Sequence, residues 1–381
     1  MTTTPVISHP RFLPFFLVAL AARFGTIALG LVLATVPPDP YSDPETPTRV
    51  RDEIRTGSAR LIEPWYRFDA TWYADVARRG YAGSQGRNGQ LGVAFMPALP
   101  ATMAAADALG LNMFWVGLLT TNLAGAVGTA VLARVAARQL GDPAAGWGTL
   151  ALFLAFPTAF FCSAPYNESF GLLFAALTLA AWQANRPVVA GVCAFGGSLA
   201  RLTGVAFGIA AVVDWFTARD RSTLRRALWV TIGSFAGVAA FWGFLWWAVG
   251  DPLANLKAHR SWGRPDLSWK NPLRTIESIN DPLVPHRWEA VVVLGATILG
   301  VRAWRKRGAF WGLVALVPVA QMFASGTLLS AHRIILAALP AFIELADLLR
   351  GRRVLLCATL LVFAYAQLTL VNRFVHWQFA G

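Results

Sequence analysis

Long apolar runs recur along this chain from residue 12 to residue 371, separated by short polar stretches. A helix needs about 20 apolar residues to cross the hydrocarbon core of a bilayer, and several of these runs approach that length. With 56% hydrophobic and only 14% charged residues, the chain also has too little polar surface for a soluble globule of its size. The pattern predicts an all-α, polytopic integral membrane protein in which residues 1–381 form one domain.

The runs predict about eleven transmembrane helices. The helical segments expected are 12–36, 93–111, 114–137, 145–162, 170–182, 188–199, 204–216, 227–249, 288–304, 310–328, 334–349 and 354–371. Two points stay open in this series. Segment 93–111 either spans the membrane or is a re-entrant or surface helix, and residues 188–216 form either one long helix or a hairpin around Arg201. We prefer the surface helix and the hairpin, because they place the motif residues on one side.

The distribution of basic residues predicts how the chain is oriented in the membrane. The formal charge is +13, but the arginines are spread between apolar runs with no basic stripe, which argues against nucleic-acid binding. Three basic clusters lie two spans apart and mark cytoplasmic loops by the positive-inside rule. They are Arg219, Arg221, Arg225 and Arg226, then Arg302, Arg305, Lys306 and Arg307, then Arg350, Arg352 and Arg353. Residues 37–92 and 250–287 become large external loops, and Asp69, Glu168, Arg201, His259 and His332 fall outside.

Within the first span, Arg23 is a charged residue at membrane depth, which costs several kcal/mol unless it finds a partner. We expect Asp69 or Glu168 as that partner. The three cysteines lie in apolar spans without metal-binding spacing, so we expect no disulfide and no metal held by cysteine.

The polar stretch 63–81 is the candidate for chemistry. If it is helical, Asp69 and Tyr73 lie on one face among ring and methyl groups. An interfacial amphipathic helix with a merely solvated Asp69 fits the same periodicity. Glu63 and Asp75 are expected to be solvated.

Four groups of residues, in order along the chain, carry a family resemblance. They are Arg67-Phe68-Asp69-Ala70 with Gly80-Tyr81 and Phe95-Met96-Pro97, then Tyr166-Asn167-Glu168-Ser169, then Ala200-Arg201-Leu202-Thr203-Gly204, and finally His332-Arg333 with Pro340. These groups resemble the motifs of the PIG-V-like mannosyltransferases, that is, GPI mannosyltransferase 2 and its bacterial relatives. The sequence departs from the family pattern at Phe68, Met96, Asn167, Leu202 and Ile334.

The resemblance implies a glycosyltransferase C-type (GT-C) fold and transfer of mannose to a lipid-linked or polymeric acceptor. Its bacterial members imply a cell (inner) membrane location with the active site facing the periplasm. Nucleotide sugars are absent outside the membrane, so the donor expected is a polyprenyl-phosphate-linked sugar held among membrane lipids. No cofactor and no metal are expected.

Displacement of a phosphate by an acceptor hydroxyl needs a base for the proton and cations for the leaving group. Asp69 is the expected base, acting with inversion at the anomeric carbon. Arg201 and Arg333 are the expected phosphate ligands, because a guanidinium offers bidentate contacts and stays charged when buried. His332 is a further candidate phosphate donor.

Other residues are given supporting or acceptor-side roles. Glu168 either caps the helix that follows it or lines the cavity. The supporting residues expected are Arg67, Trp72, Tyr73, Arg23 and Glu168, and the acceptor-side loop contributes His259, Arg260 and Trp262. A transporter or flippase for a polyprenyl- or glycan-linked lipid is the main alternative, although no internal repeat relates the two halves. A subunit that only binds a polyprenyl lipid is a third possibility.

Overall fold

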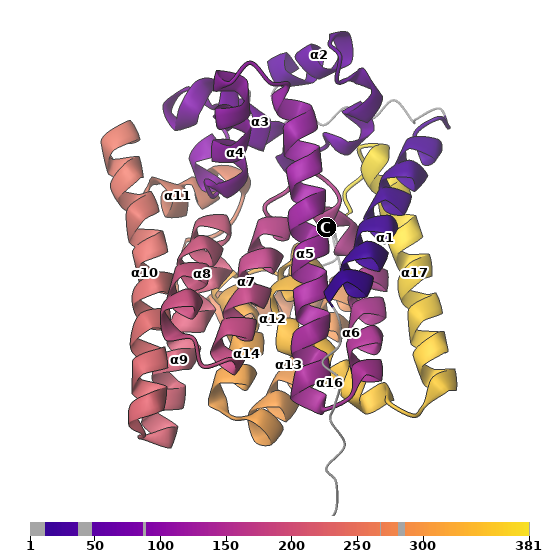
Figure 1. The fold of residues 1–381 in the computed structure, drawn as a ribbon. Coiled ribbons are helices and arrows are strands. Elements are labelled where there is room, and N and C mark those ends of the chain that lie inside the picture. The colour runs from indigo at the N-terminus through magenta and orange to yellow at the C-terminus, as the bar shows by residue number, and fades with distance from the viewer. Residues whose placement is uncertain (1–11, 37–47, 87–88, 267, 281–285, 381) are drawn as a thin grey trace, which may run out of the picture.

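The computed structural model describes residues 12–36, 48–86, 89–266, 268–280 and 286–380, and every regular element in these ranges is helical. The longer helices stand side by side, and short ones gather at the upper end in Figure 1. The helices that stand side by side are α1 (Phe12–Leu33), α5 (Met113–Leu140), α6 (Pro143–Ala155), α7 (Glu168–Gln183), α8 (Pro187–Ala200), α9 (Val205–Ala218), α10 (Arg221–Val249), α13 (Arg287–Arg307), α14 (Ala309–Ser325), α16 (Leu339–Leu349) and α17 (Arg353–Val375).

The shorter elements connect these helices. They are α2 (Thr48–Thr56), η1 (Arg60–Trp65), α3 (Asp69–Gly83), η2 (Gly92–Ala94), α4 (Ala98–Ala108), η3 (Ala159–Cys162), η4 (Leu202–Gly204), α11 (Ala254–Lys257), η5 (Ala258–Trp262), α12 (Asn271–Glu277), η6 (Ser278–Asn280), α15 (Ala331–Ile334) and η7 (Ile335–Ala337). The helices α2, α3 and α4 form a cap over the upper end of α5 (Figure 1). Helices α2 and α3 of this cap lie within the predicted first external loop, 37–92, whereas α4 follows it.

Four helices, α1, α5, α10 and α17, are long and apolar enough to cross a membrane. Four shorter apolar helices follow the same composition: Pro143–Ala155, Pro187–Ala200, Leu202–Ala218 and Ala309–Ser325. These features and the all-helical architecture support an integral membrane protein. The figure of about eleven spans stays a prediction, because a helix such as α6 is only about 20 Å long at 1.5 Å per residue.

The segment 93–111 does not form a spanning helix. Its helical part is α4, which begins after Pro97 and has 11 residues, about 17 Å at the usual rise. Figure 1 places α4 beside α3 in the cap. These observations favour the surface or re-entrant interpretation over a transmembrane one.

Residues 188–216 form a hairpin, so the alternative of one continuous helix is wrong. Helix α8 ends at Ala200, and Arg201 is extended with φ −150° and ψ 142° before η4 and α9 begin. The turn packs tightly: a Cβ on Gly204 would lie 2.6 Å from the backbone nitrogen of Ser198. Only glycine fits there, and Arg201 is held at the tip.

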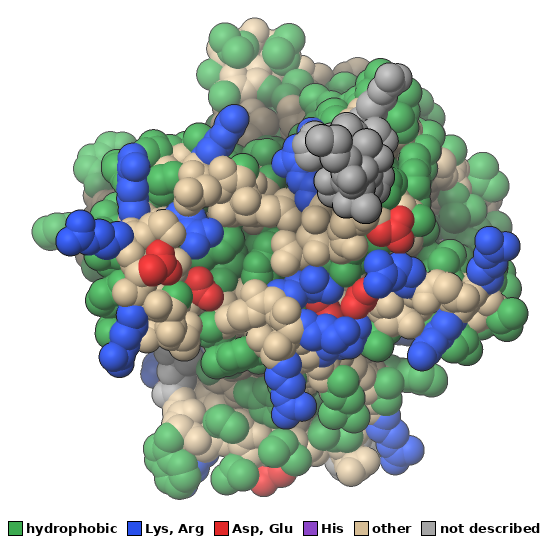
Figure 2. Space-filling model, turned by 60° about the horizontal axis from the view of Figure 1, so that its bottom comes forward, with side chains coloured by type: hydrophobic (Ala, Val, Ile, Leu, Met, Phe, Trp, Pro, Cys, Tyr) green, Lys and Arg blue, Asp and Glu red, His purple; other side chains and the backbone are tan. Residues whose placement is uncertain are grey.

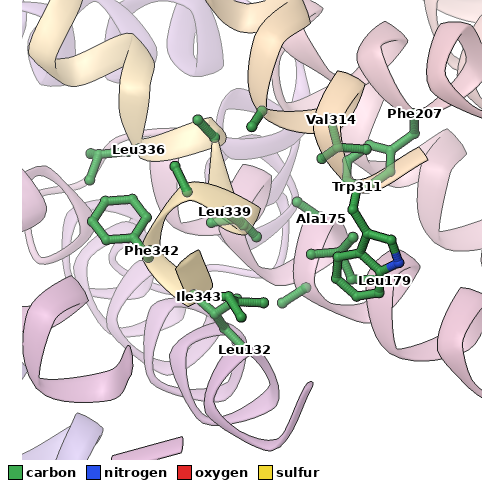
Figure 3. Close-up of a cluster of buried hydrophobic side chains, with 14 of the residues drawn as sticks. Leu132, Ala175, Leu179, Phe207, Trp311, Val314, Leu336, Leu339, Phe342 and Ile343 are labelled. Atoms are coloured by element: carbon green, nitrogen blue, oxygen red, sulfur yellow. The ribbon is translucent and has the colours of Figure 1, made fainter. Parts of the chain in front are cut away.

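The buried hydrophobic core lies in the middle of the helix bundle and holds its helices together. Figure 3 shows Leu132 of α5, Leu179 of α7, Trp311 of α14 and Phe342 of α16 turned toward one another. Close ring packing adds to this cluster, since Trp182 stacks on Phe310 with centroids 3.7 Å apart and planes within 7°. The core therefore fixes how the ends of these helices, where the motif residues lie, are placed relative to one another.

The end opposite the cap is basic. The α9–α10, α13–α14 and α16–α17 connections all lie there, and Figure 2 shows Lys and Arg side chains gathered on that face. Two acidic residues of α16 neutralise part of this charge: Glu344 Oε2 forms an ion pair with Arg302 Nε at 2.8 Å, and Asp347 Oδ2 pairs with Arg302 Nη2 at 2.5 Å. The three predicted basic loops therefore share one end of the molecule, as the positive-inside rule requires of cytoplasmic loops.

Candidate active site

Helix α3 starts at Asp69, directly after a residue in an unusual backbone conformation. Phe68 has φ +48°, a region that side chains other than glycine seldom adopt. Such strain is found mainly where surrounding packing enforces it, often at functional sites. The Phe68 ring packs against Trp377 with centroids 5.5 Å apart. This turn directs Asp69 into the molecule at the start of α3.

The first two turns of α3 are enclosed by protein rather than lying on a surface. Seven consecutive residues, from Ala70 to Val76, are buried. The amphipathic-helix interpretation with a solvated Asp69 is therefore wrong. Asp75 is also not solvated, because it is fully buried and accepts from Arg79 Nε at 2.7 Å and from Ser84 Oγ at 2.6 Å.

Four charged residues from four separate segments form one continuous series of ion pairs, here called the ion chain: Asp69, Arg333, Glu168 and Arg201. Asp69 Oδ2 forms an ion pair with Arg333 Nη1 at 2.6 Å, and Glu168 Oε1 accepts a hydrogen bond from Arg333 Nε. The same Glu168 oxygen pairs with Arg201 Nη1. The four formal charges of the ion chain sum to zero.

Each member of the ion chain lies at a break between helices. Glu168 begins α7, and the preceding Asn167 is anchored by its side chain to Leu99 N at 2.9 Å and Met96 O at 2.8 Å. Arg333 lies in α15, which follows Ser330 with φ +63°. Because the helices are interrupted at these points, the side chains at their ends can converge on one place. Continuous helices would spread the same side chains along their lengths.

Glu168 acts on the arginines rather than on its helix. Among the described residues, Glu168 Oε1 accepts from Arg333 and Oε2 has no hydrogen-bond partner, so the carboxylate does not cap the amides of α7. The Glu168 side chain is only 1% exposed, against 20% for Arg201, 14% for Arg333 and 24% for Asp69. A buried carboxylate with two guanidinium partners fixes the positions of both.

A pocket opens beside the ion chain. The pocket is small, and its charged walls are Glu168, Arg201 and Arg333. The remaining walls are small or apolar, contributed by α7, the α8–α9 hairpin, α14 and η7; they include Gly171, Ala175, Gly197, Phe207, Val314 and Leu336. Glu168 Oε2 is buried and has no hydrogen-bond partner among the described residues. The pocket thus joins an apolar slot to a charged end.

Aromatic rings pack against Arg333 of the ion chain. The Arg333 guanidinium lies 4.7 Å from the Tyr166 ring centre and 4.9 Å from that of Phe161. Tyr73 is buried with its ring against Tyr166, 5.9 Å between centroids. Burial raises the pKa of the Tyr73 hydroxyl, and the neighbouring Glu168 and Asp69 raise it further, so it stays a neutral hydrogen-bond donor.

Arg23 and Arg67 lie apart from the ion chain. Arg23 is buried, and its guanidinium donates to Cys162 O at 2.8 Å, Gly125 O at 3.0 Å and Thr129 Oγ1 at 2.8 Å. The expectation of a carboxylate partner for Arg23 is wrong, because carbonyl groups of α5 and η3 satisfy it. Its contacts hold α1 against the bundle.

Arg67 ties the turn before α3 to its surroundings. Its guanidinium binds both carboxylate oxygens of Glu63, at 2.7 Å and 2.9 Å, so Glu63 is paired rather than solvated. Arg67 Nε also donates to Val375 O at 3.0 Å, and the guanidinium lies 4.7 Å from the Trp377 ring centre. Arg67 therefore supports the strained Phe68 turn from behind.

His332 turns away from the ion chain although it adjoins Arg333. Its Nδ1 lies 3.8 Å from Glu289 Oε1, and its Nε2 lies 3.5 Å from Ala380 O. The structure therefore does not bring this imidazole together with Asp69, Glu168, Arg201 and Arg333.

The second external loop reaches α3 through Trp262. The Trp262 ring packs edge-on against Trp72, 5.0 Å between centroids, and against Phe95 at 5.5 Å. Arg260 points outward instead, with a side chain 72% exposed and paired with Asp266. Burial and then the charge of Arg264 lower the pKa of His259 from 6.5 to about 4. His259 and Arg264 thus lie close together on the inner side of this loop.

Arg264 is the residue of this site that sequence reasoning missed. It is half-buried, and Arg333 and Asp69 are the charged groups near enough to act on its pKa. The only sequence signal was its place between Trp262 and Pro265 in a loop rich in rings and cations.

Within the described ranges, no group of three or more metal-ligating side chains is arranged to hold a metal; the expectation of no metal stays a prediction.

A comparison with protein families adds a finding about the middle of the chain. Residues 97–246 match the family model of the Alg9-like mannosyltransferases. No curated protein matches the chain. The match runs from the start of α4 into α10 and includes Glu168 and Arg201, whereas Asp69 and Arg333 lie outside it. It supports a membrane-embedded glycosyltransferase of mannosyltransferase type; the PIG-V-like enzymes are a related but different group.

Proposed function

We propose that this protein is an inverting glycosyltransferase that moves a sugar, mannose by resemblance, from a polyprenyl-phosphate donor to a lipid-linked or polymeric acceptor. The observation that carries the proposal is the ion chain, which joins the partly exposed carboxylate of Asp69 to two guanidinium groups that line one pocket. A general base and cations for a leaving phosphate are the groups that such a displacement needs. The four residues of the ion chain, each of which belongs to a PIG-V-like motif, include these groups.

Asp69 is the proposed base. Its Oδ2 is held by Arg333, and no hydrogen bond to Oδ1 is made by the described residues. In the reaction, the acceptor oxygen bonds to the anomeric carbon as its proton passes to the Asp69 carboxylate. The bond from that carbon to the phosphate oxygen breaks, and the polyprenyl phosphate leaves with the electron pair.

Arg201 and Arg333 are the proposed ligands of the departing phosphate. Both line the pocket, and Glu168 holds both guanidinium groups in place before the substrate arrives. Preorganised charge of this kind stabilises a developing anion without reorganisation during the reaction. The apolar slot beyond them suits the first isoprene units of a lipid donor.

The orientation proposed follows from the two ends of the molecule. The basic loops lie opposite the cap, so the cap and the ion chain face outward when the basic end is cytoplasmic. In a bacterial cell this places the reaction on the periplasmic face of the inner membrane. About eleven spans, with the cap helices outside the count, fit this arrangement.

The test uses purified protein in detergent with radiolabelled polyprenyl-phosphate mannose and a membrane lipid extract. Transfer of label to a new lipid or polymer product is expected, with polyprenyl-phosphate glucose as the comparison for sugar choice. Absence of any transferred label, together with movement of the labelled lipid across proteoliposomes, would instead favour the flippase alternative.

A further inference from the structure

The ion chain has a consequence for how an anionic substrate is attracted. Two carboxylates and two guanidinium groups cancel, so Arg201 and Arg333 have no net charge to offer while Asp69 and Glu168 are ionised. A phosphodiester donor brings one negative charge, and the monoester that leaves brings close to two at neutral pH. A further cation is needed beside the ion chain to balance either one.

Arg264 meets this need by its position. It follows Gly263, a left-handed glycine with φ +69°, and its backbone N–H donates to His259 O at 3.1 Å, which closes a tight turn. Trp262 holds one side of this turn against Trp72, three residues after Asp69. The turn therefore carries Arg264 toward the start of α3.

The other side of the turn is tied to the end of α14. Asn271 Nδ2 donates to Asp266 O at 2.9 Å and to Ala324 O at 2.8 Å. Pro265 lies against Gly326, where an added Cβ would come within 2.6 Å of the proline ring. Arg264 is thus positioned between two anchors, one on α3 and one beside α14.

Arg264 differs from its neighbour Arg260 in having no acidic partner among the residues that the structure describes. Arg260 pairs with Asp266 in solvent, whereas no carboxylate of the described chain lies within ion-pair distance of Arg264. The charged groups that act on Arg264 are Arg333, which repels it, and Asp69, which attracts it. An arginine in this position stays protonated, so the site carries a net charge of one positive unit.

We propose that Arg264 is a ligand of the substrate phosphate and supplies the positive charge that the ion chain lacks. This inference rests on the proposed function for the identity of the phosphate, a polyprenyl ester. Arg264 would contact the phosphate from the loop side, opposite Arg201 on the hairpin. Its contribution grows during transfer, because the leaving monoester carries more charge than the donor.

The test compares Arg264→Gln and Arg264→Lys with Arg260→Gln, an exposed arginine of the same loop. The probes are farnesyl phosphate, farnesol and inorganic phosphate, with affinity measured by calorimetry in detergent. Loss of a charge-assisted contact should weaken farnesyl phosphate binding by about 10- to 100-fold in Arg264→Gln. Farnesol binding should be unchanged in every variant, and Arg260→Gln should behave as wild type.

Two further measurements separate the role from a structural one. Unliganded thermal stability should not fall in Arg264→Gln, since the change removes repulsion from Arg333. The farnesyl phosphate affinity should also become less sensitive to salt in this variant, while Arg264→Lys keeps the salt dependence but binds more weakly than wild type. If Arg264→Gln does not fold, Arg264→Met takes its place, since it also removes the charge, and wild-type affinity in that variant would overturn the proposal.

The outcomes distinguish this inference from the proposed function. Unchanged farnesyl phosphate affinity in both Arg264 variants, or parental kcat and KM for transfer in Arg264→Gln, overturns the role of Arg264 and leaves the transferase intact. Arg264-dependent binding in a protein that transfers no sugar supports the phosphate site and overturns the transferase. Equal, Arg264-dependent affinity for inorganic phosphate would overturn the polyprenyl ester as the ligand.

Discussion

Arg333 Nη1 forms an ion pair with Asp69 Oδ2 across 2.6 Å, and the Nε of the same guanidinium donates to Glu168. One arginine near the C-terminal end of the chain therefore connects the start of α3 to the start of α7. The proposed base is therefore held in place by one of the two proposed phosphate ligands. Variants at these positions must be assessed by activity, donor affinity and stability together.

Replacing Asp69 with Asn tests the base directly. Asn keeps the shape of the side chain but cannot accept a proton, so the transfer rate should fall by at least about 100-fold, the lower range for loss of a general base. Donor affinity should change little, because the phosphate ligands remain. Rate, donor affinity and detergent thermal stability are measured on one preparation.

The control for this variant is Asp251→Asn, a partly exposed carboxylate paired with Lys257 on the second loop. It should retain parental activity. Parental transfer by Asp69→Asn would refute the mechanism. Loss of stability and donor binding along with activity would show that Asp69 serves mainly to hold Arg333.

Lysine replacements separate the two arginines. Arg333 has two carboxylate partners and two aromatic faces, whereas Arg201 has Glu168 alone. Lysine cannot reproduce the planar fork, so both variants should bind donor more weakly, by on the order of 1–3 kcal/mol. Arg333→Lys should also lower the melting temperature more than Arg201→Lys. Unchanged donor affinity in both would place the phosphate elsewhere.

The orientation can be tested by labelling single cysteines in intact cells. Leu61 in the cap is 66% exposed, and Arg352 at the basic end is exposed. In a background without Cys162, Cys193 and Cys357, an impermeant thiol reagent should label a cysteine at position 61 and spare one at position 352 until the cells are permeabilised. The reverse pattern would place the ion chain on the cytoplasmic side. Asn167, which is buried, is unsuitable as a reporter.

The buried His259 predicts a pH dependence of stability. Its pKa is lowered from 6.5 to about 4, by burial first and then by Arg264. In the unfolded chain His259 binds a proton below about pH 6.5, whereas in the folded protein it does so only below about pH 4. The folded protein therefore has its full stability above about pH 6.5 and loses stability as the pH falls from about 6.5 to about 4. His259→Asn should flatten the melting temperature across this range, while His376→Asn should keep the parental slope. An unchanged slope in His259→Asn would contradict the prediction.

The sequence was most informative where function and local structure coincide. Asp69, Glu168, Arg201 and Arg333 were selected as motif residues at the ends of apolar runs, and the structure joins all four. The helical class and the break at Arg201 were predictable for the same reason, because a charged residue between two short apolar runs favours a turn at that point. Their chemical roles remain predictions.

What the sequence could not supply was the identity of partners. Arg23 was expected to need a carboxylate, but backbone carbonyl groups of neighbouring helices satisfy it, and no periodicity reveals such contacts. Nor could His332 be separated from Arg333, since which of two adjacent side chains faces a cavity depends on the turn at Ser330. Arg264 carried no motif, and only the packing of Trp262 brings its loop to the site.

The short helices α7 and α8 determine how deep in the bilayer the candidate site lies. Their 16 and 14 residues measure about 24 and 21 Å, against a hydrocarbon core of about 30 Å. In the proposed orientation, with the basic ends of both helices at the inner boundary of the hydrocarbon, Glu168 and Arg201 lie below its outer boundary. The main free-energy cost of binding a lipid donor is then the dehydration of its phosphate group, which must move below the membrane surface to reach the arginines. The polyprenyl tail stays in the hydrocarbon throughout. Thinner bilayers should ease that descent, which makes membrane thickness a control on the rate of transfer.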